Sequence, residues 1–374
     1  MKEFRHIVIF SSLYPPHLGG VEQFTQSLAS SLAADCKVTV FCLDSENIRE
    51  DFRDDKLTIH YLPCYCLFQG RLPIPKWTAS NLIHSFFQTN QVEFGIIQTR
   101  LYPLSLEAAC MLSKEKIPFI LIEHGTGHIQ FGNGIMNQLW QLYEHGITCR
   151  LNRYCRNYYG VSQASLDWLQ HFGITGKGVI HNGVNPVDFQ TLQPLFREKF
   201  NIPPQDDVIV FAGRILKEKG ILDLLQAFNQ LDSDNVHLFI AGTGDMDLLS
   251  SWRTNPRIHI LGKISHSELL SLFADTQIFC LPTMYPEGLP TVILEAGYCG
   301  IPVITVDSGG IRDVIFDDIT GVFVKPGSPE ELIKKMKYLI SNSSERQRLG
   351  SNLQNLIQKE FIWPEIIKKI KMLW

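Results

Sequence analysis

The chain has 374 residues, of which 45% are hydrophobic and 19% are charged. This length accommodates two domains of ordinary size, and the composition excludes a disordered, collagen-like or coiled-coil chain. The 34 Lys and Arg residues against 38 Asp and Glu give a formal net charge of −4, which excludes an overall basic footprint for nucleic acid.

The nine cysteines are scattered and lack the paired C-x-x-C pattern of zinc sites. We therefore expect reduced thiols and a cytoplasmic protein, bound at most peripherally to the inner face of the cell membrane. The apolar run at 7–10 is too short for the central segment of a signal peptide. No apolar run approaches the roughly 20 residues that a membrane-spanning helix needs.

Short apolar runs alternate with helical patterns and predict two series of parallel β-strands. The first series lies at 6–10, 38–43, 96–98, 119–122 and 158–161. The second lies at 208–211, 236–241, 258–261, 278–281 and 303–306. We therefore predict two Rossmann-like, doubly wound α/β domains at 1–188 and 208–357, joined by a proline-containing linker at 189–207.

The loops after such strands bind ligands, in a cleft where the carboxyl ends of the two sheets face one another. Gly19 and Gly20 follow the first strand and precede a helical pattern. Glycines let the backbone approach a ligand closely, and the first amides of a helix can hold an anion. Plain turn geometry explains a glycine pair equally well, so this loop identifies no site by itself.

The second domain opens with two spaced cations between its first strand and its first helix. Arg214 suits a diphosphate by its fork of donors and Lys219 as a point charge, although solvated surface cations are the simpler reading of either residue alone. Gly242 and Gly244 follow the next strand and suit a tight turn near a nucleotide. The third glycine of a dinucleotide fingerprint is missing.

A loop and helix start at 282–296 is the most informative stretch. Glu287 follows a buried strand, and Glu295 lies eight positions later, where the 3.6-residue helical repeat directs it towards the same side. The amides near Gly288 and Leu289 would form an anion seat beside the carboxylate. A carboxylate pair suits sugar or ribose hydroxyls. A dipole-favoured acid and a surface Glu are the alternative, which leaves the apolar surroundings of Glu295 unexplained.

In the order and spacing of these residues, the chain resembles the retaining glycosyltransferases of family 4, which have the two-domain GT-B fold. The resemblance spans nearly the whole chain and includes four further motifs: Asn182-Gly183-Val184, Ala212-Gly213, Gly309-Gly310 and Phe361-Ile362-Trp363. It implies two domains facing a central cleft, and a C-terminal helix at 358–374 that crosses back to the N-terminal, acceptor-side domain.

The resemblance also implies a role for each residue of the donor site. Arg214 and Lys219 would bind the diphosphate of a nucleotide sugar and stabilise the charge of the leaving group. Glu295 would hold the ribose hydroxyls. The glycines of the implied donor site are Gly19, Gly20, Gly242 and Gly244.

The transferred sugar would be held by Glu287 with the amides of Gly288 and Leu289. His124 follows a strand of the first domain, where the resemblance places a histidine facing the donor sugar. A lone histidine is more often structural, but its place between a buried strand and Gly125 favours the functional role. The implied catalytic set is His124, Glu287, Arg214 and Lys219.

The implied mechanism is a front-face displacement with retention, in which the donor phosphate takes the acceptor proton. We expect no metal, because the donor loops contain no Asp-x-Asp motif and cations can replace the ion. No cofactor is expected beyond the co-substrate, a UDP- or GDP-linked hexose or N-acetylhexosamine. The acceptor would be a saccharide or lipid-linked saccharide of a bacterial surface polysaccharide (lipopolysaccharide or capsule) or of a glycolipid.

The acceptor side is less clearly marked. Arg100 stands where a histidine is frequent in the family and would meet an anionic acceptor, although a surface arginine is as good an interpretation. The stretch 63–77 mixes apolar residues with Arg71 and Lys76, which suits either a membrane surface or a buried loop. The basic, amphipathic tail at 366–374 favours packing over membrane binding.

Two other functions remain compatible with these motifs: a nucleotide-sugar epimerase and a catalytically inactive nucleotide-sugar-binding protein. A nicotinamide oxidoreductase is disfavoured, because neither domain shows a full G-x-G-x-x-G with an acid roughly 20 residues on.

Overall fold

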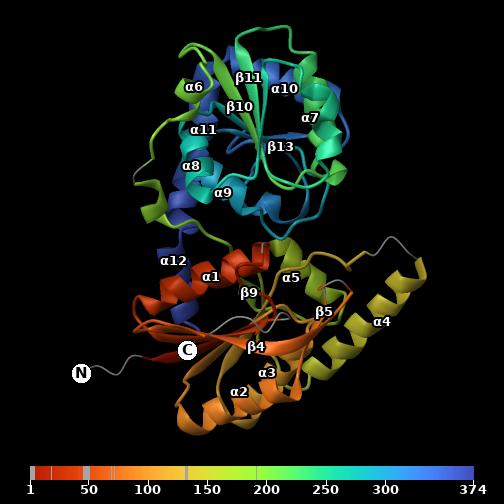
Figure 1. Ribbon diagram of the computed structural model, residues 1–374, viewed down its shortest axis with the longest axis vertical. Coiled ribbons are helices and arrows are strands. Elements are labelled where there is room, and N and C mark those ends of the chain that lie inside the picture. The colour runs from red at the N-terminus through yellow and green to blue at the C-terminus, as the bar shows by residue number, and fades with distance from the viewer. Residues whose placement is uncertain are drawn as a thin grey trace. The chain divides into compact units, whose positions relative to one another are not determined.

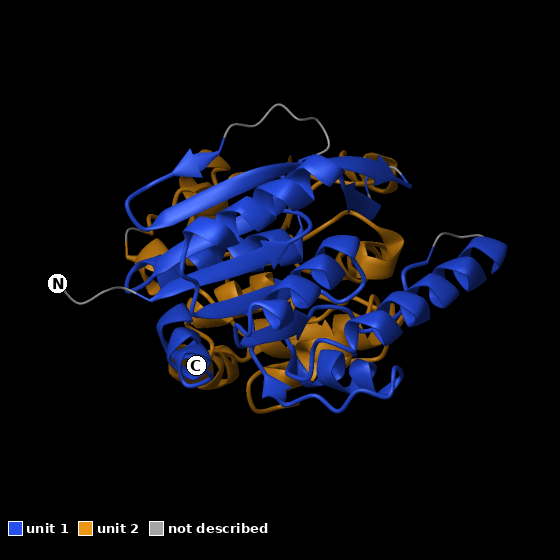
Figure 2. Ribbon diagram, turned by 90° about the horizontal axis from the view of Figure 1, so that it is seen from below, with its two compact units in different colours: residues 1–182, 363–374 blue, residues 183–362 orange. Residues whose placement is uncertain are grey.

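The computed structural model (Figure 1) describes residues 5–17, 19–44, 51–68, 70, 72–130, 134–190 and 192–374. The chain forms two compact units, coloured separately in Figure 2. Unit 1 is Met1–Asn182 with Trp363–Trp374, and unit 2 is Gly183–Ile362. The chain therefore leaves unit 1 once, and its C-terminal segment returns to it.

Unit 1 is built on a nine-stranded sheet in the order β3-β4-β2-β1-β6-β7-β8-β9, with β5 paired to β4. Its strands are β1 (His6–Ser11), β2 (Lys37–Asp44), β3 (Phe52–Arg53), β4 (Leu57–Leu67), β5 (Leu72–Pro75), β6 (Phe94–Gln98), β7 (Phe119–Glu123), β8 (Tyr158–Gly160) and β9 (Gly178–Val179). All pairings are parallel except those of β3 and β5 with β4. Strands β1, β6 and β7 are buried along their whole length, as expected for a sheet covered on both faces.

The helices of unit 1 are α1 (Gly20–Ala33), α2 (Trp77–Thr89), α3 (Pro103–Lys114), α4 (Gly134–Leu151), α5 (Gln163–Gln170) and α12 (Trp363–Lys371). Helix α12 buries its apolar side against α1: Trp363 meets the ring of Phe24 edge-on at 5.3 Å between centroids. Its lysines remain on the solvent side. This amphipathic division explains why the C-terminal segment packs into the core of unit 1.

Unit 2 contains a six-stranded sheet, entirely parallel, in the order β12-β11-β10-β13-β14-β15. Its strands are β10 (Asp207–Ala212), β11 (Val236–Ala241), β12 (Ile258–Gly262), β13 (Ile278–Leu281), β14 (Val303–Val306) and β15 (Val322–Val324). Its α-helices are α6 (Phe196–Lys199), α7 (Ile221–Asn229), α8 (His266–Ala274), α9 (Thr291–Tyr298), α10 (Pro329–Ser341) and α11 (Ser343–Glu360), and its 3₁₀ helices are η1 (Pro186–Phe189), η2 (Lys217–Lys219), η3 (Met246–Trp252) and η4 (Gly309–Asp313).

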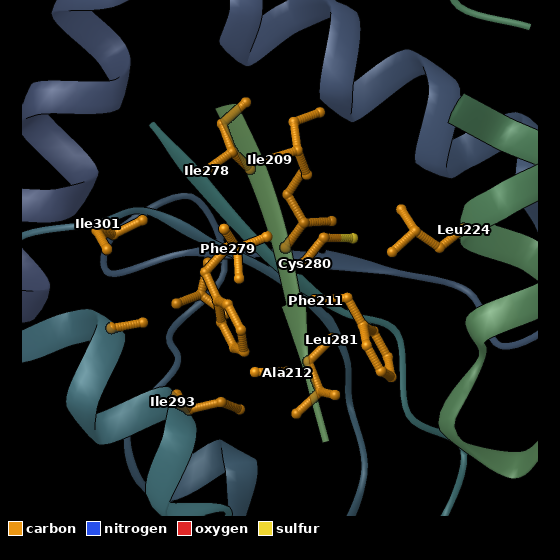
Figure 3. Packing of buried hydrophobic residues seen from close by; sticks show 14 of the residues in the cluster. Ile209, Phe211, Ala212, Leu224, Ile278, Phe279, Cys280, Leu281, Ile293 and Ile301 are labelled. Atoms are coloured by element: carbon orange, nitrogen blue, oxygen red, sulfur yellow. The ribbon is translucent and has the colours of Figure 1, made fainter. Parts of the chain in front are cut away.

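The core of unit 2 is centred on β10 and β13 (Figure 3). Phe211 of β10 and Leu281 of β13 are fully buried, and Leu224 of α7 and Ile293 of α9 contribute to the same cluster. The strand order reverses between β10 and β13, since β11 and β12 follow on one side and β14 and β15 on the other. Ligands of open α/β sheets bind beyond the carboxyl ends of the strands at such a switch point.

The boundaries of the units differ from those expected from the sequence. The chain changes unit at Asn182 and again at Ile362, and the stretch 189–207 is part of unit 2. Phe196 and Ile202 of this stretch are buried in the core of unit 2, so its apolar residues outweigh the prolines that suggest a linker. Residues 358–360 end α11, and only the residues from Trp363 onwards join unit 1.

The stretch 63–77 also has a definite structure. It forms the end of β4, the antiparallel partner strand β5 and the start of α2. Arg71 lies outside the described residues. Within the described part of the chain, no helix is both long and apolar enough to cross a membrane.

Candidate functional site

The loops after β10 and β13 meet at the switch point of unit 2. The amides of Met284 and Tyr285 donate hydrogen bonds to the carbonyl of Glu218, at 2.8 and 3.1 Å. Gly220 has a left-handed φ of 72°, and a Cβ there would lie 2.1 Å from the carbonyl oxygen of Pro282. Only glycine allows this close approach, so Gly220 lets the two loops pack against each other.

Lys219 and Glu287 form an ion pair across these loops, between Nζ and Oε1. The lysine is 6% exposed, and its Nζ lies 5.6 Å from the centre of the Tyr285 ring. Glu287 is partly exposed. From the sequence, Lys219 is predicted to bind the diphosphate and Glu287 the transferred sugar. Their direct contact is not predicted. The carboxylate of Glu287 compensates the charge of the buried lysine.

The backbone of Glu287 is held by the turn at Gly309 and Gly310. The amide of Gly310 donates to the carbonyl of Glu287 at 2.9 Å. Gly309 has a φ of 57°, and a Cβ there would lie 2.1 Å from the same carbonyl oxygen. This glycine pair, which the sequence analysis uses only as a family motif, therefore supports the acidic residue of the site.

Gly288 and Leu289 follow Glu287, immediately before α9. Neither amide donates a hydrogen bond to another described backbone group. Pro290 is the N-cap of α9 and Thr291 its first residue. Glu287 thus lies outside α9. The prediction that the helical repeat directs Glu287 and Glu295 towards the same side therefore does not apply.

Glu295 lies within α9 and is 9% exposed. Its Oε1 atom is 3.0 Å from Nε2 of His266, the first residue of α8. This hydrogen bond raises the pKa of His266. The sequence analysis misses His266, because only the fold brings the start of α8 to α9. The histidine orients one oxygen of the carboxylate predicted to bind ribose.

Arg214 lies in the loop after β10 and is exposed. It forms no ion pair with another described residue, so its guanidinium is available to an anion. Gly242 and Gly244 lie beside this loop. A Cβ on Gly242 would lie 1.8 Å from the carbonyl oxygen of Gly213, and one on Gly244 would lie 2.3 Å from that of Ile215. The structure therefore explains these two glycines by close packing of neighbouring loops.

In unit 1, His124 lies after β7 and is half-buried. Its Nε2 atom is 2.7 Å from Oε1 of Gln98, and its ring meets Phe24 of α1 at 4.8 Å between centroids. Loss of solvation lowers the pKa of His124 to about 3, so the ring is neutral at pH 7. Gly19 is the N-cap of α1 and Gly20 its first residue, at the carboxyl end of β1.

Arg100 is buried, with 1% exposure, in contrast to the predicted contact with an acceptor. Its Nε atom is 3.1 Å from Oε2 of Glu123, and its NH2 nitrogen is 3.4 Å from Oε2 of Glu144. The guanidinium also lies 3.6 Å from the centre of the Phe172 ring. Because two buried carboxylates already compensate its charge, the structure argues for a structural role.

A cavity of about 520 Å³ lies elsewhere in unit 2. Its lining includes Gln277, which directly precedes β13, Tyr298, the last residue of α9, and Gly300, which lies between α9 and β14. These residues mark the amino ends of β13 and β14, opposite to the carboxyl ends at which ligands of parallel sheets bind. The cavity is therefore separate from the Lys219 and Glu287 site.

Two family models match the chain. The model described as glycosyl transferases group 1 matches residues 193–356, and the model described as glycosyltransferase family 4 matches residues 18–188. The two matches fall on unit 2 and on unit 1. Together they account for most of the chain.

Similar proteins agree with these matches. The uncharacterized glycosyltransferase MJ1069 of Methanocaldococcus jannaschii is 22% identical over 98% of this chain and 97% of its own length. The capsular polysaccharide biosynthesis glycosyltransferase CapM of Staphylococcus aureus is 29% identical over 50% of this chain and 51% of its own. The structure of Anabaena HepE in complex with UDP-glucose superposes with a TM-score of 0.75, at 18% identity, and 98% of each chain is covered.

Proposed function

The chain belongs to the group 1 glycosyltransferases of family 4, with the GT-B fold, and from this membership we propose that it is a retaining enzyme. As a family 4 glycosyltransferase it transfers a sugar from a nucleotide sugar. We propose a UDP- or GDP-linked hexose or N-acetylhexosamine as the donor. The acceptor that we propose is a saccharide or lipid-linked saccharide.

The ion pair of Lys219 and Glu287 is the observation that carries this proposal. The pair lies at the switch point of unit 2, where Gly220 and Gly309 allow two loops to pack closely. Lys219 offers a positive charge in a poorly solvated position, and Arg214 adds an exposed one. A donor diphosphate would take over Lys219 and release the carboxylate of Glu287 to accept hydrogen bonds from sugar hydroxyls.

The reaction needs a stabilised leaving group more than it needs a protein base. The bond between C1 of the sugar and the donor phosphate breaks, and the acceptor oxygen bonds to C1 on the same face. The acceptor proton passes to the departing phosphate oxygen, whose charge Lys219 and Arg214 stabilise. Retention of configuration follows from attack on the face of departure.

His124 and Glu295 complete the proposed donor contacts. Neutral at pH 7, His124 would offer its ring to a sugar hydroxyl by hydrogen bonding and would not serve as a charged acid. Glu295, oriented by His266, would accept hydrogen bonds from the ribose through its other oxygen. Gly288 and Leu289 would present their amides to the sugar or phosphate.

The names of two similar proteins support the substrate classes. HepE is described in complex with UDP-glucose, and CapM is named for capsular polysaccharide biosynthesis. We therefore put UDP-linked sugars first in a donor screen. Carbohydrate acceptors of surface polysaccharides come first in the acceptor screen.

We also propose that unit 1 contacts a membrane surface through apolar side chains on adjacent elements. Trp77 is 81% exposed at the start of α2, and Ile135 and Leu142 of α4 are 73% and 69% exposed. Phe68, which follows β4, meets the ring of Trp140 of α4 at 5.8 Å, so the hairpin of β4 and β5 adjoins α4. Such a surface suits a lipid-linked acceptor.

Turnover assays test the proposed reaction. With a nucleotide sugar and an acceptor, the wild type is expected to form a glycoside of retained configuration, read by NMR of the anomeric proton. Glu287→Ala is expected to lose turnover, because the sugar loses its carboxylate contact. Conversion of the nucleotide sugar without any acceptor would instead identify an epimerase. Donor binding without turnover under any acceptor would identify an inactive binding protein.

A further inference from the structure

Three histidines of unit 1 bring their ring nitrogens close together, and none of the three belongs to the proposed donor set. His128 lies in the loop between β7 and α4, His145 on α4, and His171 at the C-cap of α5. One ring nitrogen from each lies within 4.8 Å of the others. Among the described residues this is the only group of three or more potential metal ligands so close together.

A hydrogen bond to Glu144 favours the tautomer of His128 that can bind a metal ion. Nδ1 lies 2.9 Å from Oε2 of Glu144, a carboxylate oxygen that can only accept while it is ionised. Nδ1 therefore carries the proton in the neutral ring, and Nε2 keeps its lone pair. This is the carboxylate and histidine arrangement that orients metal-binding imidazoles in proteins.

The spacing of the nitrogens also suits a metal. Zinc binds imidazole nitrogen at about 2.0–2.1 Å, so two nitrogens at a tetrahedral angle lie about 3.4 Å apart. The Nε2 atoms of His128 and His171 are 3.2 Å apart. His145 is exposed on α4, its ring also contacts that of Phe172 at 4.8 Å between centroids, and a change of its side-chain rotamer would close the remaining distance.

Packing holds two of the rings in place. The ring of His171 stacks on Trp168, with 4.8 Å between centroids and 6° between planes. His128 meets the same indole edge-on at 4.8 Å. A simple hydrogen bond would explain the contact of His128 with His171. It would leave unexplained why the third imidazole, from a different element, is directed at the same point.

We propose that His128, His145 and His171 bind one Zn²⁺ ion, with three imidazole ligands and a fourth position open to solvent. Imidazole ligands suit zinc and neighbouring divalent transition metals, whereas Mg²⁺ and Ca²⁺ prefer oxygen. Glu144 is the outer partner that orients His128. The site goes beyond the proposed transferase reaction, which needs no metal at the donor.

The ion would act as a clamp on the loop that contains His124. Glu144 accepts from Arg100, and Arg100 pairs with Glu123. Oε1 of Glu123 accepts hydrogen bonds from the amides of His124 and Gly125, at 3.1 and 2.8 Å. A zinc ion joining this loop to α4 and α5 would therefore restrict the position of His124, without touching substrate.

Calorimetric titration of ZnCl₂ into the full-length protein, first stripped with EDTA, tests the site. The wild type is expected to bind one ion that the double variant His145→Gln/His171→Gln does not bind. Both histidines are exposed, so the double variant should keep the wild-type circular dichroism spectrum. His84→Gln, an exposed histidine on α2, is the matched control and should bind like the wild type.

One further variant and the comparison with the wild type distinguish this site from other sites that bind zinc. Zinc held by exposed thiols such as Cys66, Cys110 and Cys149 would persist in the double variant, so only the difference from the wild type counts. Glu144→Gln is expected to weaken binding on the order of 10–100-fold, as outer partners of metal ligands do. Equal zinc stoichiometry and affinity in the wild type and the folded double variant would overturn the proposal, as would the absence of binding by the wild type.

Discussion

Gly309 supports the donor site, and Gly327 offers a comparison at a position away from Glu287. Gly309 adopts a left-handed backbone and lies against the carbonyl of Glu287, so a side chain there would push the acidic residue away. Gly327 also has a left-handed φ, of 65°, but nothing lies within 4 Å of the place of its Cβ. An alanine at Gly327 would therefore strain the backbone alone, whereas an alanine at Gly309 would also displace Glu287.

Gly327→Ala is expected to lose about 1–2 kcal/mol of unfolding free energy, because a left-handed backbone is costly for alanine, and Gly309→Ala is expected to lose more, because its Cβ also meets the carbonyl oxygen of Glu287. Only Gly309→Ala should also weaken donor binding and turnover, since it displaces Glu287. Urea denaturation gives the first quantity, and calorimetry with a nucleotide sugar gives the second. Wild-type donor affinity in Gly309→Ala would mean that the turn does not position Glu287.

His266 gives the site a pH dependence of defined sign. Its hydrogen bond to Glu295 raises its folded pKa above the usual 6.5. The stabilisation is therefore complete below about pH 6.5 and is lost as the pH rises through the raised, folded pKa. Removing the histidine should cost stability at low pH and little at high pH.

The measurement is the free energy of unfolding of the wild type minus that of His266→Gln, over a pH series that spans neutrality. This difference is expected to shrink as the pH rises. His84→Gln, whose ring forms no ion pair with a described residue, should show no such trend. A difference that stays constant or grows with pH would contradict the assigned pairing.

Among the helices of unit 1, α4 has a buried face and also exposes large apolar side chains. Its buried residues include Trp140, Glu144 and Ile147, while Ile135, Leu139 and Leu142 are exposed. Figure 1 shows the N-terminal end of α4 extending beyond the sheet of unit 1. A helix that exposes large apolar side chains in this manner suits a lipid surface.

Flotation with lipid vesicles tests this contact. The wild type is expected to float with anionic phospholipid vesicles, and Leu139→Ser combined with Leu142→Ser should float several-fold less, because apolar area is lost from the contact. Val187→Ser removes an equally exposed apolar residue from unit 2 and should float like the wild type. If the wild type remains with the unbound protein on both anionic and neutral vesicles, the membrane contact is wrong.

The strands differ in how clearly the sequence predicts them. Each of the ten apolar runs chosen from the sequence is a strand, because strands buried on both faces read as continuous apolar segments. Strand β4 has no continuous apolar run, because its residues are partly exposed and its alternation of apolar and polar residues stops before Pro63. Strands β3, β9 and β15 have only two or three residues, too few for a periodic signal.

Single residues of the candidate site can be proposed from the sequence, but their pairings cannot. The loops after β10 and β13 could be chosen because ligand sites follow parallel strands. Glu295 was found by its apolar surroundings, whereas its partner His266 lies 29 positions away on another helix. Arg100, predicted as an acceptor contact, is buried, because its pairing with Glu123 and Glu144 depends on the folded arrangement of β7 and α4.

In the whole molecule, the proposed zinc ion and the side-chain cations have different roles. The proposed transfer uses Lys219 and Arg214 at the donor, so turnover is expected to persist in excess EDTA. The melting temperature should fall, because zinc binding to the folded state alone stabilises it. Unchanged melting of the double variant His145→Gln/His171→Gln in EDTA is the control. Complete loss of turnover that manganese restores would contradict a metal-free transfer.

The proposed function depends above all on Lys219, which is paired with Glu287 and would receive the diphosphate of a nucleotide sugar. Calorimetric titration of UDP-glucose and related nucleotide sugars into the wild type, Lys219→Ala and Lys334→Ala tests it most directly. Lys334 is an exposed lysine on α10, and its variant should bind a nucleotide sugar like the wild type. Lys219→Ala should bind at least tenfold more weakly, which corresponds to about 1.4 kcal/mol. Equal affinity of Lys219→Ala and the wild type, or no binding of any nucleotide sugar by the wild type, would contradict the claim.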